Sequence, residues 1–273
     1  MDNIDITELK KIVTQAGEAI LKIYDTDFSV EVKEDDSPLT QADLAAHEVL
    51  CEGLSQRFPG VPILSEESSI PDFETRRTWS DYWLVDPLDG TKEFVNRNGE
   101  FTVNVALIED HEPSVGLVGV PVTKKVYVGD VKMGTAFVES KGQSEILTGR
   151  LFDNRTDLRV VASRSHGGGE LEAFLKKLNQ EFPELTQRSF GSSLKLCILA
   201  LGDADFYPRI GPTNEWDIAA AHAVLRAAGG DLYEMSGTAK KYNTKESLLN
   251  ENFYAVGDRS YDWQGLVTRL LEG

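Results

Sequence analysis

The spacing of apolar residues changes twice along the chain, and these changes limit the folds that it can adopt. Apolar residues recur at helical spacing over residues 6–23 and again over 44–58, on either side of a short alternating segment at 28–32. Between residues 61 and 147 the pattern becomes one of short strands separated by turn residues. Beyond residue 154 strands and helices alternate. This order predicts an α+β half followed by an α/β half.

The expected elements can be placed along both halves. Asp5 and Glu8 predict a capping box at the start of one helix, and Thr40 begins a second helix. First-half strands are predicted at residues 61–64, 82–85, 101–108, 115–120, 125–128, 136–139 and 144–147. Second-half strands are predicted at 159–162, 187–190, 204–210, 231–234 and 253–256, and helices at 170–179, 192–201, 215–228 and 261–271. Alternate apolar residues from Phe101 to Leu107 predict an antiparallel sheet with one buried face. We divide the chain into residues 1–155 and 156–273 and expect the site in the cleft between them.

The charge balance excludes several classes of partner. The 273 residues include 45 Asp and Glu against 28 Lys and Arg, a formal net charge of −17. Such a chain repels polyanions, which argues against a nucleic-acid polymer or an anionic membrane as a partner held by charge. Cys51 and Cys197 are too few and too far apart for a disulfide scaffold. The sequence contains neither a signal-peptide pattern nor a run of about 18 apolar residues. We therefore expect a soluble protein of the cytoplasm.

Residues 83–91, Trp-Leu-Val-Asp-Pro-Leu-Asp-Gly-Thr, are the most informative segment. An apolar strand leads directly into two carboxylates, Asp86 and Asp89, with Pro87 fixing the backbone between them. Two carboxylates at the end of a strand can converge on one point together with the carbonyl of Leu88. Thr91 follows where a helix start can offer N–H groups to an anion. The alternative is an ordinary turn with solvated carboxylates.

Two other acidic positions repeat this arrangement. The strand predicted at 61–64 is followed by Glu66 and Glu67, and Asp217 lies in the first turn of a predicted helix. Taken singly, these are equally well explained as a solvated strand end and a favourable helix-dipole charge. Taken together, separated carboxylates without a His or Cys cluster are typical ligands of a hard divalent cation such as Mg²⁺. None of the four histidines has zinc-site spacing.

Basic groups that can hold a phosphate are few. Lys195 follows Ser192 and Ser193 at the start of a predicted helix, where hydroxyl and N–H groups can face an anion. Arg209 and His166 each come at or just after the end of a predicted strand. The alternative for Lys195 is a surface lysine beside an ordinary helix cap. Bound cations would resolve the repulsion between a phosphate ester and a chain of net charge −17.

These motifs resemble the lithium-sensitive, Mg²⁺-dependent phosphatases of the inositol monophosphatase superfamily. Within it, the chain is most similar to the bacterial 3′(2′),5′-bisphosphate nucleotidases. The resemblance covers residues from about 30 to 255 and rests on segments in a fixed order: 37–43, 64–67, 83–94, 98–104, 163–166, 191–195, 207–209 and 216–217. It implies a sandwich of alternating helix and sheet layers, an α+β half against an α/β half.

The resemblance also implies roles for individual residues. Glu66, Asp86 and the Leu88 carbonyl hold one Mg²⁺, and Asp86, Asp89 and Asp217 hold a second. Asp43, together with Glu66, serves a third and weaker metal. Asp43 and Thr91 orient and deprotonate the attacking water. The remaining substrate contacts come from Asp89, Gly90, Thr91 and Lys92 around the scissile phosphate, and from His166, Ser192, Lys195 and Arg209 around the nucleoside and its second phosphate.

The implied reaction removes the 3′-phosphate of adenosine 3′,5′-bisphosphate, a by-product of sulfate assimilation, and gives AMP and phosphate. The sulfated form of this nucleotide is a second candidate substrate. Two alternatives remain open: a phosphatase of inositol phosphates or of fructose 1,6-bisphosphate with the same metal site, and a binding protein without activity. A peripheral position at the cytoplasmic face of the inner membrane and the oligomeric state also remain open.

Overall fold

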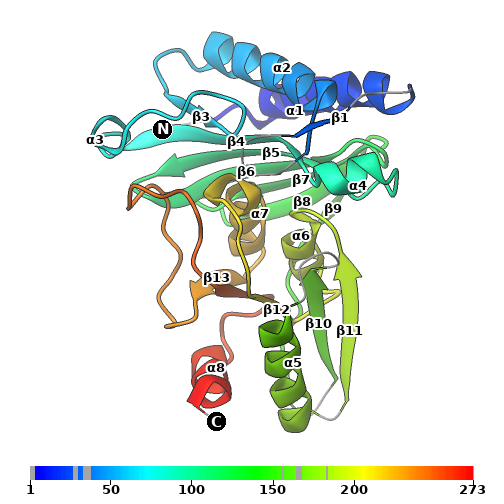
Figure 1. Ribbon diagram of the computed structural model, residues 1–273, viewed down its shortest axis with the longest axis vertical. Coiled ribbons are helices and arrows are strands. Elements are labelled where there is room, and N and C mark those ends of the chain that lie inside the picture. Colours follow the sequence, from blue (N-terminus) through cyan, green and yellow to red (C-terminus); the bar gives the residue numbers. More distant parts are fainter. Residues whose placement is uncertain are drawn as a thin grey trace.

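The computed structural model describes residues 4–26, 30–32, 38–154, 157–163, 168–182 and 184–272. Its helices and sheets alternate in five layers (Figure 1). Two helices lie outermost at one end, followed by a first sheet, a pair of central helices, a second sheet and two further helices. The layered architecture expected from the resemblance is therefore confirmed. In the described part of the chain, every helix is too short or too polar to cross a lipid bilayer.

The outer helices of the first half follow their predicted caps. Helix α1 (Ile6–Tyr24) begins after Asp5, whose carboxylate accepts hydrogen bonds from the N–H groups of Thr7 and Glu8. Helix α2 (Gln41–Arg57) begins after Thr40, as predicted. Strands β1 (Val30–Val32) and β2 (Pro38–Thr40) form a small antiparallel pair between the two helices. Residues 28 and 29 of the predicted alternating segment lie outside the described residues.

The first sheet contains the seven strands expected for this half, in the order β3-β4-β5-β6-β7-β8-β9. Their bounds are β3 (Ile63–Ser65), β4 (Asp81–Asp89), β5 (Thr102–Glu109), β6 (Glu112–Val120), β7 (Lys125–Asp130), β8 (Thr135–Ser140) and β9 (Gln143–Ile146). Only the β3–β4 pair is parallel. The short helix α4 (Thr91–Val95) begins at the helix start expected at Thr91, whereas the short helix α3 (Phe73–Arg76) was not predicted.

The prediction of one buried face for this sheet is wrong. Val103, Val105 and Leu107 of β5 pack in a core cluster with α1 and α2, but Ala106 and Ile108 on the opposite face are also buried. The cover on that face is α7 (Glu215–Ala227), which comes from the second half of the chain. A period of two cannot reveal a helix more than 100 residues away, so the second buried face was not visible in the sequence.

Glycines in the first sheet let α7 approach closely. A Cβ added to Gly116 would lie 2.1 Å from the carbonyl oxygen of Ala220, and one added to Gly129 would lie 2.4 Å from the Cα of Val224. Any side chain at these two positions would push α7 away from the sheet. Backbone contact therefore fixes the position of α7 against the sheet. The position of the acidic first turn of α7 is fixed in the same way.

The second sheet has the order β11-β10-β12-β14-β13. Its strands are β10 (Leu158–Ser163), β11 (Leu185–Phe190), β12 (Phe206–Arg209), β13 (Asp231–Glu234) and β14 (Phe253–Val256). Helix α6 (Leu194–Ala200) joins α7 on the inner face, and α5 (Gly169–Glu181) and α8 (Trp263–Glu272) cover the outer face (Figure 1). All predicted elements of this half are present. The division at residues 155 and 156 lies outside the described residues and stays a prediction.

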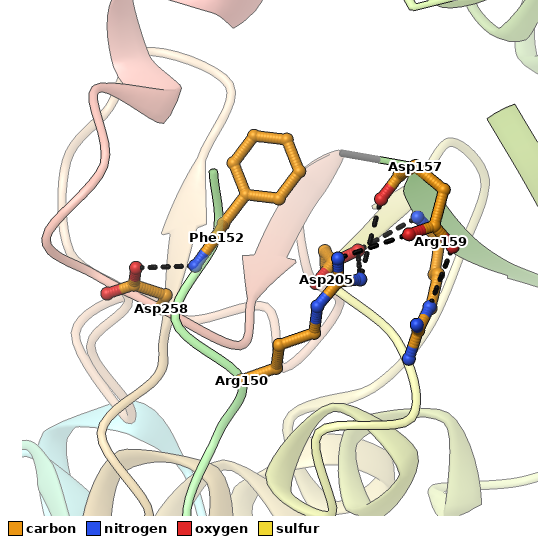
Figure 2. Close-up of polar contacts among 6 residues, drawn as sticks. All are labelled: Arg150, Phe152, Asp157, Arg159, Asp205 and Asp258. Atoms are coloured by element: carbon orange, nitrogen blue, oxygen red, sulfur yellow. Dashed lines mark hydrogen bonds and ion pairs between the residues drawn. The ribbon is translucent and has the colours of Figure 1, made fainter. Parts of the chain in front are cut away.

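A cluster of ion pairs holds the connection between the two sheets (Figure 2). Arg150 donates to Asp205 at 3.1 Å and to Asp157 at 3.2 Å, and the N–H of Arg159 donates to Asp205 at 2.9 Å. The N–H of Phe152 donates to Asp258 at 3.0 Å. These contacts lie at the start of β10 and β12, which run parallel, so the opposite ends of both strands point to the same edge of the sheet. That edge borders the candidate site.

Candidate active site

A pocket of about 480 Å³ lies where residues from the two halves meet, as predicted. Strand β4 and the start of α4 form one wall, and the starts of α6 and α7 with the end of β12 form the other. Its lining includes all but two of the predicted site residues: Glu66, Asp86, Leu88, Asp89, Gly90, Thr91, Lys92, Ser192, Lys195, Arg209 and Asp217. Asp43 lies behind Thr91, and His166 lies outside the described residues.

The acidic segment of β4 has a different local structure from the one predicted. The strand does not end at Val85 but continues to Asp89, with an irregularity in its pairing with β5 between Asp86 and Asp89. Pro87 has no N–H to donate, which suits a residue outside the regular ladder. Irregularities of this kind turn side chains out of the pleat. Asp86 accepts a hydrogen bond from the N–H of Leu88 at 3.0 Å, which fixes its orientation.

Three of the predicted metal ligands come together from separate elements. Glu66 follows β3, Asp86 lies in β4 and Asp217 lies in the first turn of α7, and one carboxylate oxygen of each lies within 4.8 Å of the others. Strands β3 and β4 are parallel, which places Glu66 and Asp86 at the same edge of the sheet. The fixed position of α7 against the sheet then brings Asp217 to this edge.

Asp43 and Asp217 each combine a helix cap with a place at the site. The N–H of Thr40 donates to Asp43 Oδ2 at 2.8 Å, and the N–H of Asn214 donates to Asp217 Oδ2 at 2.9 Å. Asp43 Oδ1 lies 3.5 Å from the hydroxyl of Thr91, which is also 3.5 Å from the Leu88 carbonyl. For Asp43 the capping interpretation and the functional one are therefore compatible, because the two contacts use different carboxylate oxygens.

Asp89 links the two walls of the pocket. Its Oδ2 accepts a hydrogen bond from the N–H of Ser193, the residue before α6, at 2.5 Å. The Ser193 hydroxyl lies 2.9 Å from that of Thr102 and donates to Asn104 at 2.8 Å. The prediction that the serine hydroxyls and N–H groups at this helix start face an anion is therefore wrong for Ser193. Its polar groups hold the start of α6 to the first sheet.

Crowding of carboxylates changes their acidity. Burial, followed by repulsion from Glu66 and Asp89, raises the pKa of Asp86 well above its usual value. Burial and then the charge of Asp89 also raise the pKa of Asp217. Burial raises the pKa of Asp89 to about 6, although Lys195 and the Ser193 N–H oppose the shift. The cluster therefore favours either protons or a cation between its oxygens.

The donor set fits a hard divalent cation. Every candidate ligand atom in the cluster is a carboxylate or carbonyl oxygen, and neither a histidine nor a cysteine contributes to the group of Glu66, Asp86 and Asp217. Cations such as Mg²⁺ prefer oxygen ligands, whereas zinc sites in proteins are usually built with nitrogen and sulfur. The structure therefore supports a metal-dependent chemistry at this cluster.

These pKa shifts predict a pH-dependent response to Mg²⁺. Because the folded-state pKa values are raised, the metal-free protein holds extra protons between the unfolded value near 3.8 and the folded value of about 6 for Asp89. The corresponding stability is present at low pH and is lost as the pH rises through about 6 and above. Mg²⁺ must displace these protons. We expect the increase in Tm on adding Mg²⁺ to be larger at pH 8 than at pH 5.5, and an equal increase at both would contradict the assignment.

The two basic residues of the opposite wall are buried. Lys195 is 7% exposed, its Nζ donates to the carbonyl of Ser192 at 2.5 Å, and it lies 5.6 Å from the ring centre of Tyr207. Burial lowers the pKa of Lys195 to about 8, against the attraction of Asp89. Arg209 is 5% exposed and donates to the carbonyl of Pro212 at 2.6 Å. The alternative of a surface lysine is therefore wrong, and both cations lie in the pocket wall.

Several pocket residues were missed by the sequence analysis. They are Ser163, Tyr207, Thr213, Asn214, Leu249 and Glu93. Thr213, Asn214 and Tyr207 are next to or near predicted site residues, so their proximity was the available signal. Glu93 resembles an ordinary first-turn acid of a short helix, and only its burial sets it apart.

Comparison with known proteins identifies close relatives. The chain matches the inositol monophosphatase family over residues 2–271. It is 46% identical over 250 residues to the 3′(2′),5′-bisphosphate nucleotidase CysQ of Salmonella typhimurium, which covers 91% of this chain and 98% of the relative. The CysQ protein of Escherichia coli strain K12 is 45% identical over the same length. The crystal structure of CysQ from Bacteroides thetaiotaomicron is 39% identical and has a TM-score of 0.81, covering 94% of this chain and 100% of that one.

Proposed function

The chain belongs to the inositol monophosphatase family, and from this premise we propose that it is a 3′(2′),5′-bisphosphate nucleotidase. It removes the 3′-phosphate of adenosine 3′,5′-bisphosphate and gives AMP and phosphate. The observation that carries this proposal is one pocket with two chemically different walls, a carboxylate cluster on one side and two buried cations, Lys195 and Arg209, on the other. A substrate with two phosphates needs both walls. Relatives at 45 and 46% identity are named for this activity.

Mg²⁺ is the proposed metal, with two ions at the site and a third, weaker one. Glu66, Asp86 and the Leu88 carbonyl hold the first ion, and Asp86, Asp89 and Asp217 hold the second. Asp43 with Glu66 serves the third. When bound, such ions lower the pKa of a coordinated water and neutralise the phosphoryl oxygens. We also propose inhibition by Li⁺ and a cytoplasmic location.

The side chains of the pocket position the reacting groups for in-line hydrolysis. Thr91 and Asp43 orient the attacking water and accept its proton, which their 3.5 Å contact allows. The backbone from Gly90 to Lys92 borders the scissile phosphate. Lys195 and Arg209, with Ser192 and His166, hold the nucleoside and the phosphate that is not cleaved. The negative charge of the chain is then offset locally on both sides of the substrate.

Phosphate release from three substrates tests the proposed function. Adenosine 3′,5′-bisphosphate, inositol 1-phosphate and fructose 1,6-bisphosphate are assayed in parallel, with and without Mg²⁺. We expect the nucleotide to have the highest kcat/KM and turnover to require the metal. A preference for either sugar phosphate would make the chain a sugar phosphatase, and binding without phosphate release would make it a binding protein.

Lys195 and Arg209, the two buried cations, should contribute to activity on the nucleotide but not to activity on inositol 1-phosphate. A charge-assisted contact to phosphate contributes roughly 1.5–3 kcal/mol, so Lys195→Ala and Arg209→Ala should each lower kcat/KM for adenosine 3′,5′-bisphosphate about 10- to 150-fold. Activity on inositol 1-phosphate, which has no second phosphate, should hardly change. Lys176→Ala on the exposed side of α5 is the matched control. Equal proportional losses on both substrates would mean that Lys195 and Arg209 support the fold or the metal site.

A further inference from the structure

Glu93 has an unusual position in the pocket wall. It is the third residue of α4, its side chain is 8% exposed, and it lines the pocket. A Cβ added to Gly90 would lie 3.3 Å from Glu93 Oε2, and one added to Gly191 would lie 3.0 Å from Glu93 Oε1. The carboxylate thus lies between two residues without side chains, one from each wall. Larger residues at either position would crowd it.

The Glu93 carboxylate has no protein partner within the described ranges, where neither a hydrogen bond nor an ion pair reaches it. The nearby N–H of Gly191 donates instead to Glu100 at 2.7 Å. Other buried acids of the pocket differ in this respect, since Asp89 and Asp217 each accept a backbone N–H. Glu93 lines the pocket, so its acceptor oxygens are available to a donor on the molecule that the pocket binds.

The chemistry of the carboxylate limits its ligand. An ionised carboxylate only accepts hydrogen bonds, so it repels phosphate oxygens and requires a donor or a cation. Glu93 adjoins Gly90, beside the proposed position of the scissile phosphate, and lies within electrostatic range of Asp89 and Lys195. On a ribose 3′-phosphate, the donor next to the phosphate is the 2′-hydroxyl group on the neighbouring carbon.

We propose that Glu93 accepts a hydrogen bond from the ribose hydroxyl adjacent to the scissile phosphate and thereby selects ribonucleotides over deoxyribonucleotides. This inference rests on the proposed nucleotidase function. Gly90 and Gly191 have a part in it, because the absence of side chains there leaves the carboxylate open to the substrate. In this arrangement Asp86, Asp89 and Asp217 belong to the proposed metal site, and Glu93 contacts the sugar.

The test compares adenosine 3′,5′-bisphosphate with its 2′-deoxy analogue in the wild type, Glu93→Gln and Glu93→Ala. The 2′-hydroxyl also changes the intrinsic reactivity of the ester, but this effect is the same for every variant. The ratio of kcat/KM values for the two nucleotides, compared between variants, therefore isolates the contact with Glu93. We expect Glu93→Gln and Glu93→Ala to lower kcat/KM for the ribonucleotide about 10-fold or more and to leave the deoxyribonucleotide nearly unchanged.

Glu100→Gln is the matched control, because it disturbs the same Gly191 wall without removing the proposed contact. Any loss in this variant should be equal for both nucleotides. The inference is overturned if the wild type does not prefer the ribonucleotide, or if the Glu93 variants lower kcat/KM by the same factor for both nucleotides. A raised Mg²⁺ requirement for both nucleotides would instead make Glu93 a cation ligand. If the wild type turns over neither nucleotide, the proposed function itself is overturned. If it turns over both and the Glu93 variants leave the ratio of kcat/KM values unchanged, only the role of Glu93 is overturned.

Discussion

Asp86→Asn is expected to lower turnover by about 10³-fold or more while the protein still folds. Asp86 is the one residue assigned to both principal metal ions, and its carboxylate lies with those of Glu66 and Asp217 within 4.8 Å. The amide removes a negative charge that both cations need. It keeps an oxygen that can accept the hydrogen bond from the N–H of Leu88, so the local backbone should be retained. The measurement is kcat/KM at saturating Mg²⁺.

The stability of the same variant gives an independent result. Burial and neighbouring carboxylates raise the pKa of Asp86, so its ionised form is unfavourable in the metal-free fold. Asp86→Asn should therefore equal or exceed the wild type in metal-free Tm at pH 8, and the increase in Tm with Mg²⁺ should be reduced. Asp81→Asn at the other end of β4, about 16 Å away, is the control. Near-normal turnover by Asp86→Asn would contradict the shared-ligand assignment.

The sequence predicted regular elements well because their patterns are local. The helix after Asp5, the helix after Thr40 and all strands of both sheets were placed within a few residues of their positions. A period of 2 or 3.6 and a capping residue are contained in the segment itself. The acidic cluster was also predictable, since Glu66, Asp86 and Asp217 each stand at the end of a strand or in the first turn of a helix.

The differences arise where distant segments decide local structure. Asp, Pro and Gly commonly end a strand, so β4 was expected to stop at Val85, yet pairing with β5 carries it through an irregularity to Asp89. Glu93 packs against Gly191 from the other half of the chain, and the charge of Asp89 from the other half acts on Lys195. The bond from Ser193 N–H to Asp89 spans 104 residues, and no pattern within either segment indicates it.

Asp43 and Thr91 are the residues proposed to activate the attacking water. General base assistance contributes about 10²- to 10⁴-fold, so Asp43→Asn and Thr91→Val should each lower kcat by at least about 10²-fold. Thr91→Ser, which keeps the hydroxyl, should stay within about tenfold of the wild type. The contact of 3.5 Å between Thr91 Oγ and Asp43 Oδ1 is long for a hydrogen bond, and such contacts tighten when substrate binds.

A double variant distinguishes a shared role from two separate ones. If Asp43 and Thr91 act on the same proton, removing either residue already prevents its transfer. The kcat of the double variant, Asp43→Asn with Thr91→Val, should then be hardly lower than that of the less active single variant. Asp43 is also the acidic residue in the first turn of α2, so Asp43→Asn removes a favourable helix-dipole charge and is expected to lower Tm, whereas Thr91→Val is not. Multiplied losses in the double variant would show that the two residues act independently. In that case the Thr91 hydroxyl would contribute through the Leu88 carbonyl, its other neighbour at 3.5 Å.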